Sequence, residues 1–110
     1  MADRIPDALM PHRNTSYKPF LATTPTGKKY GPAVTPERCQ VEEKNRLIRN
    51  NQGKEVVSST TVYLDPDHVV PVGSLYRVHI GTPHEKESTV ITAAFLDNPN
   101  APSHVVLMLE

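Results

Sequence analysis

Histidine and cysteine are the residue types in this chain with the widest chemical capacity, because both bind metal ions and both act in catalysis. The five histidines are His12, His68, His79, His84 and His104. No two of them have the spacing i, i+2 or i, i+4, and the single cysteine, Cys39, has no histidine close to it in the sequence. Zinc sites normally show closely spaced ligands. The spacing therefore predicts structural or surface histidines, and neither a metal nor another cofactor.

Cys39 is also the only candidate for a cysteine nucleophile. It lies between Arg38 and Gln40 in a strand-like stretch, and the arginine could lower the pKa of the thiol. A lone cysteine inside a strand is nevertheless better interpreted as an unreactive, partly buried thiol. A single cysteine also excludes an internal disulfide and fits a reducing setting.

The segment Thr26-Gly27-Lys28-Lys29 has part of the pattern of a phosphate-binding loop. The full pattern needs a glycine five residues before Gly27 and a serine or threonine after Lys28. Ala22 and Lys29 occupy these two positions, so the pattern fails twice. The carboxylate pairs Glu42-Glu43 and Glu85/Glu87 lie among other charged residues and are interpreted as solvated. We therefore expect no catalytic residue, and we expect that the protein is not an enzyme.

The charge balance argues against a dedicated nucleic-acid binder. The chain has 12 basic and 12 acidic residues, whereas such binders usually carry a clear basic excess. The charges are unevenly placed: five basic and two acidic residues precede residue 37, and seven basic and ten acidic residues follow it. This asymmetry suits electrostatic matching between neighbouring subunits, and solvation of both parts explains it equally well.

The elements that position these residues differ between the two parts of the chain. Residues 1–36 contain six of the 11 prolines, which predicts an extended arm with a loop over Thr23–Pro36. One strand-like stretch, Thr15–Leu21, interrupts this arm. Neither a signal peptide nor an apolar run long enough to span a membrane is present, so no membrane association is expected.

Residues 37–110 show the period of two that is typical of β-strands. Val56, Val62 and Leu64 alternate with Val57 and Tyr63, with Ser and Thr interspersed on both faces. Turn signals separate the predicted strands, which are Cys39–Asn50, Lys54–Asp65, Leu75–Ile80, Ser88–Leu96 and Ser103–Glu110. The sequence predicts a mainly β fold: a small barrel or sandwich of five to six antiparallel strands with an extended N-terminal arm and long loops.

Part of this pattern resembles a known family. A charged strand, a turn with glycine and a Glu-Val-Val-Ser-Ser-x-x-Val-Tyr strand occur in order over Glu42–Leu64. A Pro-x-Gly-Ser turn follows in Val70–Ser74, and an apolar strand, Val105–Glu110, ends the chain. The combination resembles the head-closure, or head-to-tail stopper, proteins of long-tailed bacteriophages.

The resemblance implies a structural protein of the virion neck, made in the cytoplasm of the host bacterium. Such proteins form a ring, here expected to be twelvefold or sixfold, between the portal or its adaptor and the tail terminator or tail tube. The ring closes the DNA-filled head and docks the tail. It implies no enzymatic activity.

Three groups of residues are the expected contacts in such an assembly. The arm Met1–Tyr17 would lie across a neighbouring subunit or neck ring through Ile5, Leu9, Met10 and Tyr17. The first loop would face the channel or an adjoining ring, and could touch packaged DNA, through Lys28, Lys29 and Tyr30. The second contact loop, Gly81–Ser88, is the alternative for this position, with His84, Glu85 and Lys86 as its contact residues.

Other functions share the same fold expectation. Within the virion, the alternatives are a tail terminator, an adaptor or a minor capsid protein. Outside it, the alternative is a cellular β-barrel module that binds an oligonucleotide or a peptide. An oligonucleotide-binding barrel would offer aromatic residues beside basic ones, and Tyr76-Arg77 and Lys29-Tyr30 are the only such neighbours in the sequence.

Overall fold

The computed structural model describes residues 10–11, 13–50, 52–97 and 103–110 of the 110-residue chain. These residues form β-strands and no helix, so none of them belongs to a helix that could span a membrane. The strands are β1 (Ser16–Lys18), β2 (Phe20–Thr24), β3 (Gly27–Tyr30), β4 (Cys39–Arg49), β5 (Glu55–Leu64), β6 (Leu75–Val78), β7 (Lys86–Leu96) and β8 (His104–Leu109).

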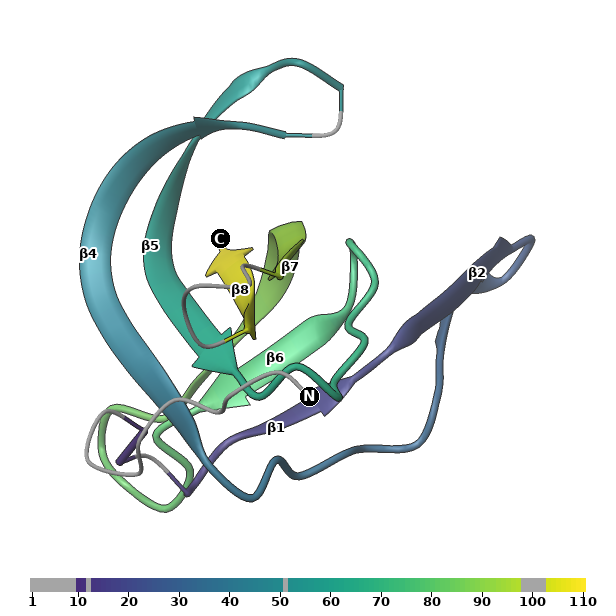
Figure 1. Ribbon diagram of the computed structural model, residues 1–110. Coiled ribbons are helices and arrows are strands. Elements are labelled where there is room, and N and C mark those ends of the chain that lie inside the picture. The colour runs from purple at the N-terminus through teal and green to yellow at the C-terminus, as the bar shows by residue number, and fades with distance from the viewer. Residues whose placement is uncertain (1–9, 12, 51, 98–102) are drawn as a thin grey trace.

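Six of the strands form one antiparallel sheet in the order β1-β6-β7-β8-β5-β4, and β2 and β3 form a separate ribbon. The sheet curls so that β4 and β5 arch over the other strands (Figure 1). Its two edge strands, β1 and β4, do not pair with each other. The sheet is therefore open and sandwich-like, which confirms the mainly β fold class and decides between the two expected architectures.

Small hydroxyl side chains allow the strong curvature of β5. Ser58, Thr60 and Thr61 are fully buried on a strand where larger side chains would collide. Ser58 Oγ donates a hydrogen bond of 2.8 Å to the carbonyl of Leu109, the last residue of β8. The partner strand β4 follows the bend through a β-bulge between Glu43 and Arg46.

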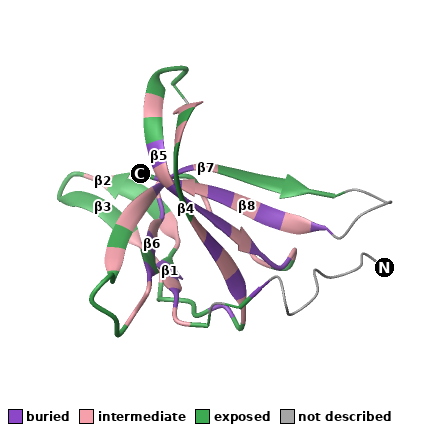
Figure 2. Cartoon of the chain, turned by 90° about the vertical axis from the view of Figure 1, so that its left-hand side faces the viewer, coloured by how far each residue is buried: buried purple, intermediate pink, exposed green. Residues whose placement is uncertain are grey.

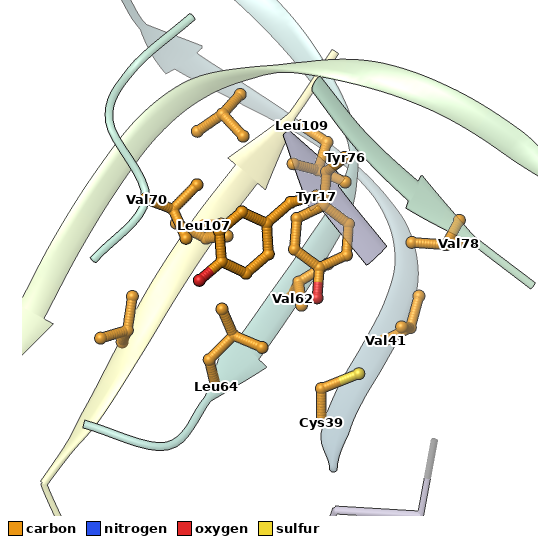
Figure 3. Packing of buried hydrophobic residues seen from close by; sticks show 12 residues of the cluster. Tyr17, Cys39, Val41, Val62, Leu64, Val70, Tyr76, Val78, Leu107 and Leu109 are labelled. Atoms are coloured by element: carbon orange, nitrogen blue, oxygen red, sulfur yellow. The ribbon is translucent and has the colours of Figure 1, made fainter. Parts of the chain in front are cut away.

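The hydrophobic core fills the concave side of the curled sheet (Figure 3). Its two largest side chains, Tyr17 and Tyr76, stand opposite each other on β1 and β6 and stack with ring centroids 5.7 Å apart. The other members are mostly aliphatic, as the shortage of aromatic residues requires: Cys39, Val41, Val62, Leu64, Val70, Val78, Val90, Val105, Leu107 and Leu109.

The N-terminal part of the chain contributes more to the fold than the sequence predicts. Met10 is 0% exposed, Tyr17 is 4% exposed, and β1 is the end strand of the main sheet. The prediction that Met10 and Tyr17 belong to an arm available to a neighbouring subunit is therefore wrong, because their own subunit already covers them. Ile5 and Leu9, the other predicted arm residues, lie outside the described residues.

The ion pair between Arg38 and Asp65 joins the start of β4 to the end of β5. Both side chains are largely buried, and the guanidinium donates to both carboxylate oxygens, at 3.0 and 2.7 Å. Bidentate geometry of this kind fixes the relative position of the two groups. It holds Cys39 opposite Leu64 at the point where the predicted turn, residues 65–67, begins.

Replacing Leu107 with alanine should lower the free energy of unfolding by about 2–5 kcal/mol, because it removes a fully buried side chain from the centre of β8. Val106, on the opposite face of the same strand, is only partly buried, so Val106→Ala is the matched control with a smaller loss. Urea denaturation followed by circular dichroism measures both. Equal losses would contradict the core assignment of Leu107.

Candidate assembly surfaces

The β2–β3 hairpin projects from the body of the subunit (Figure 1). Phe20 pairs with Tyr30 at its base and Thr24 pairs with Gly27 at its tip, and most of its residues are exposed. The base is anchored: the Phe20 N–H donates to Ser74 Oγ at 2.9 Å, and the Phe20 and Tyr30 rings meet edge to face. The predicted loop Thr23–Pro36 therefore contains the tip and the second strand of this hairpin. The segment that follows includes Val34, which pairs with Tyr17 of β1.

Lys28 and Lys29, predicted to contact the channel or DNA, lie in β3 of this hairpin and are exposed. Neighbouring residues in a strand point to opposite faces, so the two ammonium groups project from opposite sides of the ribbon. Tyr30, the third predicted residue, is half-buried at the base against Phe20. The structure therefore keeps the two lysines available for contact and gives the tyrosine an anchoring position.

The second predicted contact region forms a polar corner where four strands approach one another. Glu43 of β4 is its centre: its carboxylate accepts from Lys86 Nζ at 2.9 Å and from Thr60 Oγ1 at 3.2 Å, and lies 3.3 Å from His79 Nε2. Glu43, His79 and Lys86, together with His84, line a depression of about 500 Å³. Sequence reasoning missed Glu43 because two adjacent glutamates among charged residues look solvated.

An unusual backbone conformation places His79 in this corner. Its φ of 55° is in the left-handed region, which is uncommon for residues other than glycine. The following turn supports it, because Thr82 donates to the His79 carbonyl from both its backbone N–H, at 3.1 Å, and its hydroxyl, at 2.7 Å. β6 therefore ends at Val78 instead of continuing to Ile80 as predicted.

Glu85 and Lys86 are engaged within the subunit. Glu85 accepts a hydrogen bond of 3.0 Å from the Gly81 N–H and lies 3.8 Å from Arg77, and Lys86 is the first residue of β7. His84, the third predicted contact residue of this region, is exposed, and its backbone N–H donates to Thr82 Oγ1 at 3.2 Å. This corner is best described as a clasp that holds β4 against the start of β7.

The electrostatics of Glu43 fit this role. Partial burial opposes its ionisation, but the hydrogen bond and positive charge of Lys86, aided by Thr60 and His79, outweigh this and lower the pKa of the carboxyl group below its usual value. The carboxylate is thus stabilised in its charged form, the opposite of what a general acid at neutral pH requires.

A second polar cluster lies inside the core. Thr15 Oγ1 is 3.1 Å from the hydroxyl of Tyr76 and 3.3 Å from Cys39 Sγ. Burial raises the pKa of both the Cys39 thiol and the Tyr76 hydroxyl, so both remain protonated at neutral pH. The free thiol is fully buried, which confirms that Cys39 has a structural position.

Within the described ranges, no group of three or more His, Cys, Asp or Glu side chains is arranged to hold a metal ion. The chain matches no family model, and no curated protein or solved structure matched it. The site geometry is therefore interpreted from the chain's own residues.

The Glu43 clasp predicts an acid-dependent loss of stability. A lowered pKa means that its contribution is fully present above the unfolded-state value, about 4.3, and is lost as the pH falls through the folded-state value. Because Glu43 is half-exposed, Glu43→Gln should cost only about 0.2–1 kcal/mol at pH 7, and nothing at a pH below the folded-state value.

Denaturation curves of both proteins across this pH range measure the difference. Glu55→Gln is the control, since Glu55 pairs with Arg49 at 3.6 Å on a well-exposed surface and should contribute less. A difference that grows as the pH falls would contradict the role of Glu43.

Proposed function

We propose that this protein is a structural, non-catalytic subunit of the neck of a long-tailed phage. Its copies would form a ring between the portal or adaptor and the tail terminator or tail tube, closing the filled head and docking the tail. The observation that carries this proposal is the projecting β2–β3 hairpin. The resemblance of Glu42–Val78 to head-closure proteins supports it.

The hairpin is a costly element for an isolated subunit. A two-stranded ribbon is at best marginally stable in water, and this one buries little beyond its base. Docking on another molecule would bury its faces and offset the conformational entropy lost by ordering it. An ordered, projecting ribbon on a small sheet therefore favours a subunit whose hairpin is completed by an assembly.

The charges of the hairpin suit a position facing the channel. Lys28 and Lys29 are exposed near the tip, and ammonium groups bind phosphate without sequence preference. In the proposed ring the hairpins point inward, where one of the two lysines of each copy faces the packaged DNA and the other faces the neighbouring hairpin.

The burial of Tyr76 weighs against the alternative of an oligonucleotide-binding module. Base stacking needs exposed aromatic rings, but Tyr76, one of the two candidates in the sequence, is fully buried. Tyr30 is half-buried at the base of the hairpin. A tail terminator or adaptor uses the same kind of ring, and the neighbouring proteins that bind the ring distinguish those roles.

Electron microscopy of the purified full-length chain tests the proposal, and rings with a central channel are expected. Residues 21–29 can then be replaced by Asn-Gly, a two-residue hairpin turn that keeps the pairing of Phe20 with Tyr30. The shortened protein should keep its circular dichroism spectrum but form rings with a wider channel, or no rings.

Lys28→Ser combined with Lys29→Ser is the matched control, because it keeps the ribbon and removes only its charge; these rings should form with an unchanged channel. Rings of the shortened protein with an unchanged channel would contradict the placement of the hairpin. A full-length chain that stays monomeric at every concentration would overturn the proposed ring.

A further inference from the structure

Several stretches of strand edge in the main sheet have no partner strand among the described residues, and those along β1 and β4 are protected. Along β1, Val34 covers the edge by exchanging two hydrogen bonds with Tyr17, at 2.9 and 2.8 Å. Along β4, the edge carries charged residues and the bulge between Glu43 and Arg46. Covering segments, charges and bulges are the usual ways in which proteins prevent pairing with other chains.

Another stretch, the distal half of β7, has none of these protections. β6 pairs with β7 only through Lys86–Thr89, and no strand among the described residues pairs with Thr92–Leu96 on that side. The residues here are Ala93-Ala94-Phe95-Leu96, without a charge or a proline, and all four are exposed. Figure 2 shows this part of β7 as an exposed strand that runs beside β8.

An apolar groove runs beside this edge. Phe95 stands opposite Val105 of β8, and residues opposite each other in a sheet share a face, so Phe95 lies on the core side although it is 58% exposed. The far wall of the groove is the loop after β5, where Val69 is 81% exposed. The groove has a volume of about 400 Å³. It continues the core past Leu75, the first residue of β6, which pairs with Thr89 of β7.

We propose that this edge and groove receive residues 1–9 of a second copy of the chain as an added β-strand. Main-chain hydrogen bonds would pair the incoming segment with Thr92–Leu96, and alternate side chains would enter the groove over Phe95 and Val69. The inference rests on the proposed ring and identifies the surface through which one subunit holds the next.

The sequence of the segment suits this position. Ile5 and Leu9 are four residues apart, so in a strand they face the same side and can both enter the groove. Pro6 has the opposite parity. In a strand that pairs antiparallel with β7 through the main-chain groups of Ile5 and Leu9, the position of Pro6 points away from β7, where a proline is tolerated and prevents the addition of a further strand.

The reach and direction of the contact suit a ring. Met10 is buried in its own subunit and fixes the point from which residues 1–9 start. Nine extended residues span up to about 30 Å, a large part of the 43 Å longest dimension of the described subunit. The segment can therefore cross to an adjacent copy. A contact in which one subunit gives its arm and receives another's at a different surface is heterologous, and such contacts form rings when the rotation closes.

Disulfide trapping in the full-length protein tests the contact. One preparation carries Leu9→Cys and a second, differently tagged preparation carries Phe95→Cys; the two are mixed and oxidised. A cross-linked pair containing both tags is expected. Leu47→Cys replaces Phe95→Cys in the control, because Leu47 is an equally apolar and slightly more exposed residue, at 68%, on the protected edge strand β4. Unmodified protein, whose only cysteine is the buried Cys39, should not cross-link.

Mixed cross-links no more abundant than in the Leu47 control would overturn the inference. A chain carrying both Leu9→Cys and Phe95→Cys that formed the bond only within itself would also overturn it. Phe95→Lys and Leu47→Lys form a second pair: the former should raise the concentration needed for ring formation at least tenfold, and the latter should not. Equal effects would contradict a contact at the β7 edge. Loss of rings with Phe95→Lys but no trapping by Leu9 would contradict residues 1–9 as the segment that binds there.

The outcomes separate this inference from the proposed function. Rings that form without a Leu9–Phe95 cross-link would support the proposed ring and contradict the binding of residues 1–9 to β7. Cross-linked pairs that never form rings would support the binding of residues 1–9 to β7 and contradict the proposed ring.

Discussion

The hydrogen-bonded contact of Thr15 with Tyr76 and Cys39 is the interaction on which the curled shape of the sheet depends. Thr15 precedes the edge strand β1, Tyr76 lies in β6, and Cys39 begins the opposite edge strand β4. Main-chain hydrogen bonds do not join these two edges. A small polar cluster buried among aliphatic side chains does so instead, and in a low-dielectric interior such a cluster is tolerated because its groups satisfy one another.

The Glu43 clasp repeats this arrangement at the surface, where β4 again meets a distant part of the sheet. The inner contact is buried and its groups stay protonated, whereas the outer one relies on opposite charges in partial contact with water. The subunit therefore closes its sheet with side chains at two levels, and its main-chain edges remain separate. This gives a small protein with few aromatic residues a packed interior without the strict geometry of a closed barrel.

The strands were predictable from the sequence because their signals are local. Alternation of Val, Leu and Ser or Thr in residues 54–65, with Gly53 and Pro66 on either side, gave β5 to within one residue at each end. The role of Glu43 was not predictable, because its partners Lys86 and His79 lie 43 and 36 residues away and no local pattern brings them together.

The burial of Met10 and Tyr17 was not predictable either. The sequence predicts a strand-like stretch over Thr15–Leu21, but the proline content of residues 1–36 gives no sign that it pairs with β6 and enters the core. The hairpin was missed for a related reason: its polar residues look like a loop when nothing in the sequence shows that Phe20 is anchored to Ser74. The predicted neck function, its ring and its partners stay predictions, because they concern contacts between molecules.

The base of the β2–β3 hairpin has a consequence for how such a protein can change over time. Pro19 and Gly31 are joined by a hydrogen bond of 2.8 Å, and Tyr17 and Val34 pair beyond them, so the chain enters and leaves the ribbon at a single point of the sheet. Insertions or deletions between these anchor points leave the register of all six sheet strands untouched. Evolution, or a protein engineer, can therefore lengthen the ribbon or replace it with a foreign peptide as an independent module.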